Sequence, residues 1–173
     1  MVVGDVVIAQ AAMLVTRVGG MACAFPIAHV VETMRPMPIA PFAGSGEHAP
    51  AVVEGVAMIR GAPVPVVDAR KLLGVAAERT TRFVIVRAAD RRIALVVDAV
   101  IEVTLIELPT LARLPALLGG AHRDIISAIG GRDAELLVVL DAARVLSADS
   151  WRALEGGSRP AGHGHPADQG IRR

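Results

Sequence analysis

The stretch that most constrains the fold runs from Gly55 to Gly74, GVAMIRGAPVPVVDARKLLG. It contains two short apolar runs, Val56 to Ile59 and Val64 to Val67, on either side of Arg60 and Gly61. Apolar runs of this length separated by a pair of turn residues are typical of two strands joined by a tight turn. The stretch therefore predicts a β-hairpin whose tip carries an arginine.

Asp68 follows the second apolar run directly. Its carboxylate can accept hydrogen bonds from N–H groups two and three residues further on, so it predicts the N-cap of a short helix over 69–73 that Gly74 terminates. Pro63 and Pro65 lack a backbone N–H. We therefore expect the second strand to form hydrogen bonds on one side only, at a sheet edge or in a barrel seam.

Strand, aspartate and short helix recur in the same order near the other end of the chain. The run Leu136 to Leu140 is followed by Asp141, which lies 73 positions after Asp68. A second pair of matching segments, 24–32 and 94–102, is separated by 70 positions. Because repetition at a fixed spacing indicates a duplicated structural unit, we expect two related halves of about 70 residues.

The duplication suggests a division of the chain into a lead at 1–12, a first barrel half at 13–78, a second barrel half at 79–148, and a helix end with a flexible tail at 149–173. Further elements are expected as strands at 13–18, 21–25, 83–86, 93–97, 125–129 and 136–140, helical turns at 28–34 and 51–54, a loop at 105–118, and a last helix from Asp141 to about Leu154. Many short apolar strands separated by turn residues favour a mostly β protein with two small barrels. Barrel closure removes exposed sheet edges.

The composition excludes several classes of protein. With 53% hydrophobic and 20% charged residues, the chain is globular rather than disordered. A net charge of +1 and an aromatic content of 2% provide neither the basic face nor the stacking surface of a nucleic-acid-binding protein. No apolar stretch reaches the roughly 20 residues that a membrane-spanning helix needs, and Cys23 has no second cysteine for a disulfide. We expect a cytoplasmic protein that binds no nucleic acid and does not insert directly into a membrane.

No catalytic or cofactor motif is recognisable. Asp68, Asp98 and Asp141 each follow an apolar strand and could be taken for catalytic carboxylates, but the first and third occupy helix-capping positions. The histidines lack the spacing of a zinc site, and the paired glycines lack the Lys and Ser or Thr of a phosphate loop. These observations favour a protein-interaction module with no metal or cofactor. The alternative is an enzyme or ligand-binding protein that uses a crevice between the barrels.

The stretch 55–74 resembles the signature of the CheW family of chemotaxis coupling proteins. Three further segments are similar to that family in the same order, namely FPIAHVVETMRP, TRFVIVRAADRRIALVVDAVIEV and LLVVLDAARVL. The resemblance covers residues 13–148, and its most specific part is Ile59, Arg60 and Gly61 followed by 64–68. The chain departs from the family at Ala94, where glycine is common.

The resemblance implies two SH3-like five-stranded β-barrels with short helices and no enzymatic activity. It implies two partners, the regulatory domain of a CheA-type histidine kinase and the cytoplasmic tips of methyl-accepting chemoreceptors. A CheW-like adaptor of another signalling system is the alternative. The partner-binding residues implied by position are Val30, Glu32, Gly55, Arg60, Phe83, Val100 and Val103. The apolar members of this set could instead belong to the core, and for Phe83 we expect the core.

Arg60 is expected to serve the partner interface, because an arginine at a hairpin tip is not needed for packing. Glu32 and Arg60 both adjoin apolar positions, so we expect the fold to bring them together as an ion pair that rims an apolar groove. The alternative for Arg60 is a solvated turn residue.

Overall fold

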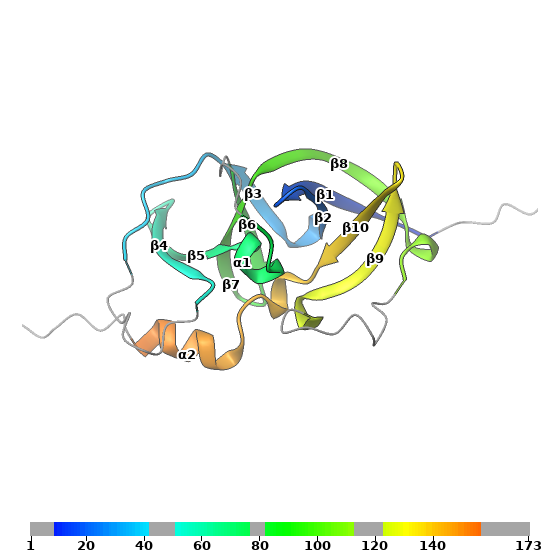
Figure 1. Cartoon of the computed structure of the whole chain (residues 1–173). Helices are drawn as coiled ribbons and strands as arrows, with labels where there is room; N and C mark the ends of the chain where they lie inside the picture. Colours follow the sequence, from blue (N-terminus) through cyan, green and yellow to red (C-terminus); the bar gives the residue numbers. More distant parts are fainter. Residues whose placement is uncertain (1–8, 42–50, 77–81, 113–122, 157–173) are drawn as a thin grey trace, which may run out of the picture.

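Figure 1 shows the computed structural model, which describes residues 9–41, 51–76, 82–112 and 123–156. The strands in these ranges are β1 (Gln10–Val18), β2 (Met21–Pro26), β3 (Val30–Met34), β4 (Val53–Ile59), β5 (Ala62–Asp68), β6 (Arg82–Ala88), β7 (Arg91–Val97), β8 (Ala99–Glu107), β9 (Ile126–Arg132) and β10 (Glu135–Leu140). The helices are α1 (Ala69–Leu73) and α2 (Ala148–Gly156), and the 3-10 turns are η1 (Ile27–His29), η2 (Leu108–Thr110), η3 (Arg123–Ile125) and η4 (Ala142–Arg144). The strands form two five-stranded sheets, which confirms the prediction of a mostly β protein.

The two sheets are built on the same plan. Sheet A has the order β8-β1-β2-β10-β9, and sheet B has the order β3-β6-β7-β5-β4. The two orders become identical when β1 to β5 are matched in turn with β6 to β10, so that β1 corresponds to β6 and β3 corresponds to β8. In both sheets the pairing inside the central three strands includes one parallel pair, β2 with β10 and β5 with β7. The duplication seen in the sequence is therefore present in the topology.

Each sheet nevertheless takes strands from both halves of the chain, which the sequence analysis did not anticipate. After β2 the chain turns through η1 and enters sheet B as β3, and after β7 it turns at Asp98 and enters sheet A as β8. The ranges 13–78 and 79–148 thus exchange two strands, β1 and β2 for β6 and β7, and do not form one barrel each. β3 forms its hydrogen bonds with the distant strand β6, and β8 forms its hydrogen bonds with the distant strand β1. Pairing over such distances cannot be deduced from the repeat alone.

Neither sheet closes into a hydrogen-bonded ring within the described ranges. β8 and β9 are the outer strands of sheet A, and β3 and β4 are the outer strands of sheet B. The expected barrels are therefore strongly curled sheets that stay open along one seam, and the five-stranded, SH3-like description otherwise holds.

Three apolar clusters form the core. One lies on the inner face of sheet B and includes Phe83 and Ile85, and a second lies on the inner face of sheet A and includes Val15 and Leu137. The third and largest contains residues from both sheets, so it joins them. Because side chains alternate between the faces of a strand, one strand can serve two clusters, as β6 does by directing Val84 to the shared cluster.

The local predictions that were based on turn residues and helix-capping residues were confirmed. Asp68 accepts a hydrogen bond from the Arg70 N–H at 2.9 Å and caps α1, which ends at Gly74 with φ +65°. Asp141 accepts from the Ala143 N–H at 2.9 Å in the equivalent place. The hairpin with Arg60 at its tip is also present.

Other local predictions were wrong. The segment 28–34 was expected to be helical, but only η1 is, and the rest is β3, since β-branched Val30, Val31 and Thr33 favour a strand when a partner strand is available. The expected helical turn at 51–54 ends in β4, and β8 extends to Glu107 into the expected loop. The last helix is divided into η4 and α2.

Candidate functional site

Glu32 and Arg60 form a two-pronged ion pair at one end of sheet B, as the sequence predicted. The Nε and Nη2 atoms of Arg60 donate to the Glu32 carboxylate at 2.8 and 2.6 Å. Arg60 occupies the β4–β5 hairpin tip with φ +50° and its side chain is 71% exposed, whereas that of Glu32 is 20% exposed. The hydrogen bond from Arg60 lowers the pKa of Glu32 and raises that of Arg60. Glu32 thus holds a guanidinium group that faces solvent.

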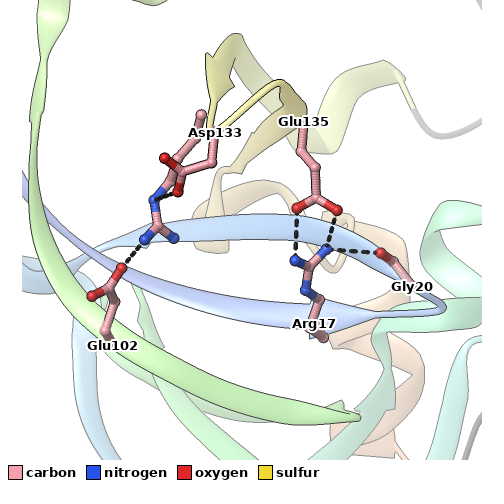
Figure 2. Close-up of polar contacts among 6 residues, drawn as sticks. Arg17, Gly20, Glu102, Asp133 and Glu135 are labelled. Atoms are coloured by element: carbon pink, nitrogen blue, oxygen red, sulfur yellow. Dashed lines mark hydrogen bonds and ion pairs between the residues drawn. The ribbon is translucent and has the colours of Figure 1, made fainter.

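The same ion pair spans the open seam of sheet B, because Glu32 lies on β3 and Arg60 adjoins β4, the two outer strands. Sheet A has an equivalent pair at its own seam, in which Arg132 of β9 donates to Glu102 of β8. Figure 2 shows Glu102 and Asp133 on either side of this arginine. The sequence analysis aligned Glu102 with Glu32 across the repeat but did not identify the second pair.

A further ion pair in Figure 2 joins Arg17 of β1 to Glu135 of β10 at 2.6 and 3.0 Å. Arg17 also donates to the Gly20 carbonyl at 3.0 Å. The hydrogen bond to Glu135 raises the pKa of Arg17, and that from Arg17 lowers the pKa of Glu135. These contacts tie the β1–β2 turn to the β9–β10 hairpin and were not predicted.

The three valines assigned to the partner surface differ in exposure. Val30 on β3 and Val100 on β8 are partly buried against the cluster shared by the sheets. Val103 is 56% exposed and lies in a row with Ile101 and Leu105, which are 50% and 64% exposed. Figure 1 shows β8 arching over β1 and β2 on the outside of the molecule. β8 therefore presents an apolar row of which the sequence analysis identified only one member.

Gly55 and Phe83, the other two assigned residues, do not lie on a surface. Phe83 is fully buried on the inner face of sheet B, so we assign it to the core. Gly55 has φ +148°, and a Cβ atom there would meet the Ala40 carbonyl oxygen at 2.3 Å. The neighbouring Val56 exchanges two backbone hydrogen bonds with Ala40, at 2.8 and 2.9 Å. Gly55 therefore serves the close approach of two backbone segments.

A buried ionic network lies where the chain passes from sheet B to sheet A. Arg70 donates to Asp68 at 2.8 and 2.7 Å, and its Nη1 lies 3.7 Å from Asp98. Asp98 in turn accepts from the Gly19 N–H in the β1–β2 turn at 2.5 Å. These contacts connect a sheet B strand end, a crossing point and a sheet A turn, so the network has a structural role.

Cys23 is a free cysteine that is buried in β2. Burial raises the pKa of the Cys23 thiol to about 12, which makes it a poor nucleophile. Within the described ranges no three His, Cys, Asp or Glu side chains gather where they could hold a metal ion. None of the helices in the same ranges has the length and apolar character needed to cross a membrane.

Comparisons with known proteins agree with this architecture. The family model described as CheW-like domain matches residues 12–150. The crystal structure of the scaffolding protein TtCheW from Thermoanaerobacter tengcongensis is similar, with a TM-score of 0.70 and 20% identity over 82% of this chain and 96% of that one. No curated protein matches the sequence. Since the family model covers most of the chain, the protein belongs to the family of CheW-like domain proteins.

Proposed function

We propose that this protein is a non-enzymatic adaptor that couples a CheA-type histidine kinase to the cytoplasmic tips of chemoreceptors. The observation that carries the proposal is the family match over residues 12–150. The described residues add an exposed ion pair and an exposed apolar row. Partners of this kind place the protein in the cytoplasm.

The surface we assign to partner binding combines the Glu32–Arg60 pair with the exposed row on β8. Arg60 is held in one orientation by two hydrogen bonds, so little side-chain entropy is lost when it contacts a partner. Arginine is enriched among the residues that dominate binding energy at interfaces. The apolar row of Ile101, Val103 and Leu105 supplies surface that a partner can bury.

The test replaces Arg60. An exposed ion pair contributes little to folding, so Arg60→Ala should leave the melting temperature unchanged while weakening kinase or receptor binding at least about tenfold. Arg60→Lys should restore only part of the affinity, because an ammonium group cannot reproduce the planar fork of the guanidinium. Calorimetric titration with a CheA regulatory domain and with a receptor fragment would measure both effects.

Arg144→Ala is the matched control, because Arg144 is also an exposed, ion-paired arginine, at 3.2 Å from Asp141. It should bind both partners like the wild type. If Arg60→Ala also binds like the wild type, this surface is wrong. If the wild-type protein binds neither partner at micromolar concentration, the coupling role itself is wrong, and the chain serves another signalling system.

A further inference from the structure

Sheet B is split between β5 and β7 at the end near the β4–β5 hairpin. The two strands pair in parallel only at 66–68 and 94–96. Pro63 and Pro65 precede the paired stretch and have no N–H with which to continue the ladder. The sequence analysis expected these prolines to prevent pairing on one side of β5, and the structure confines that effect to the first part of the strand. A cavity of about 530 Å³ lies beside this unpaired part.

The cavity is mostly apolar and has α2 as one wall. Val56, Pro63 and Pro65 line it from the strands, and Trp151 and Leu154 line it from α2. Figure 1 shows α2 running below β5 and β7. Since the lining is aliphatic and aromatic, the cavity suits an apolar side chain.

The two acidic residues of the lining are already engaged. Arg91 pairs with Glu155 at 2.6 Å and lies 4.0 Å from Asp90. The same guanidinium lies 4.7 Å from the centre of the Trp151 ring. These contacts fix the indole at the side of the cavity and neutralise Glu155.

Arg92 of the lining and its cross-strand neighbour Arg87 are in the opposite situation. Arg87 of β6 and Arg92 of β7 are directly opposite each other in the antiparallel register, and Arg92 lines the cavity. Both are exposed, and neither has an ion pair within the part of the chain that the structure describes. The charge of Arg92 contributes to the lowered pKa of Glu32, but the Glu32 carboxylate is bound to Arg60. Like charges in directly opposite positions destabilise a sheet. A bound anion would relieve this repulsion between Arg87 and Arg92.

We propose that the cavity and the Arg87–Arg92 pair form a docking site for an acidic linear segment of a protein partner. An aliphatic side chain of that segment occupies the space between the two prolines and Trp151, and a neighbouring carboxylate is bound by the two arginines. The site adjoins the Glu32–Arg60 pair, since the charge of Arg92 acts on Glu32. Its lining includes neither Glu32 nor Arg60, and the proposal does not depend on the assignment made above.

Trp151 provides a direct readout, because the chain has one tryptophan and no tyrosine. Titration with an acetylated octapeptide of alternating glutamate and leucine should change its fluorescence in a saturable way. Arg92→Glu should weaken this binding at least about tenfold, as expected when a charge in contact with a ligand is reversed. Peptides with lysine in place of glutamate, or with alanine in place of leucine, should bind at least about tenfold more weakly to the wild type.

Arg35→Glu is the matched control, since it makes the same change of charge at another exposed arginine, one that follows β3. It should bind the peptide like the wild type. Arg92→Glu places opposite charges across the β6–β7 pair but also removes the attraction between Arg92 and Glu32, so its melting temperature should stay within about 3 °C of the wild type. The proposal fails if Arg92→Glu binds normally, if Arg35→Glu is equally impaired, or if the lysine peptide binds as well as the acidic one.

Discussion

At the scale of single residues, backbone position decides what several side chains can do. Arg60 and Gly55 both have positive φ, but the first lies at an exposed hairpin tip and the second within β4. Positive φ at the tip directs an arginine into solvent, where it is available for binding. Positive φ inside the strand leaves room for the Ala40 carbonyl. The family resemblance grouped the two residues together, and the structure separates their roles.

Gly55→Ala should therefore be strongly destabilising. A Cβ atom at this position would overlap the Ala40 carbonyl oxygen and would force a side chain into a strained φ, for which we expect a loss of about 2 kcal/mol or more in the free energy of unfolding. Gly131→Ala is the control, because nothing lies within 4 Å of its added Cβ and its φ is not in the strained range. It should be neutral or stabilising by up to about 1 kcal/mol in urea denaturation. Equal stabilities for the two variants would contradict this account of Gly55.

At the scale of elements, α2 is an attached helix rather than part of either sheet. Leu154 is 7% exposed and packs against the cluster shared by the sheets, and Trp151 and Glu155 both contact Arg91. Trp151 fastens α2 to the body through a cation–π contact with Arg91. The flexible tail was predicted from Gly156 onward; Gly156 is instead the last residue of α2, and the rest of the predicted tail lies outside the described residues.

Two truncations should separate the helix from the tail. Deleting 157–173 should leave the melting temperature unchanged, because this Gly- and Pro-containing, polar composition offers little apolar surface to bury. Deleting 148–173 should lower the melting temperature by about 5 °C or more, since it also removes one buried leucine and the contacts to Arg91. Differential scanning calorimetry would measure both. A comparable loss in the shorter deletion would show that the tail packs against the body.

At the scale of the whole molecule, two open sheets are held together by a shared apolar cluster and by one buried ionic network. Desolvation raises the pKa of Asp68, but the hydrogen bonds from the side chain and backbone of Arg70 outweigh it, so this pKa lies below its ordinary value. A pKa that is lowered by folding contributes stability at pH values above the unfolded pKa of about 3.9. That contribution is lost as the pH falls through the folded pKa.

Asp68→Asn tests the network, because the amide oxygen can still cap α1 but carries no charge. It should cost about 2–3 kcal/mol at pH 7, the range for a hydrogen bond to a charged group, and should make the loss of stability below about pH 4 less steep. Glu135→Gln is the control, since its pair with Arg17 is exposed. It should have little effect on unfolding at pH 7. If both variants unfold like the wild type at pH 7, the network does not join the sheets.

The sequence by itself determined the features that depend on a few neighbouring residues. Turn pairs such as Gly19 and Gly20, capping by Asp68 and Asp141, and alternation of apolar residues act over short distances, so the hairpins, caps and strand content could be predicted. The repeat could also be read directly, because it is a property of the sequence. The Glu32–Arg60 pair was predicted from position and charge, and the structure confirms it.

Only the tertiary structure decided which sheet each strand joins. The two halves follow the same plan, so β3 and β8 occupy equivalent positions in the two sheets. Local sequence therefore does not distinguish an arrangement in which the halves exchange strands from one in which they do not. Hydrogen bonds to distant strands decide between the two. The sheet that each strand joins in turn determines which of its side chains are buried and which are exposed. Phe83 was expected in the core and lies there. The exposed row on β8 and the Glu102–Arg132 pair at the second seam could not be predicted, because each depends on contacts between segments far apart in the chain.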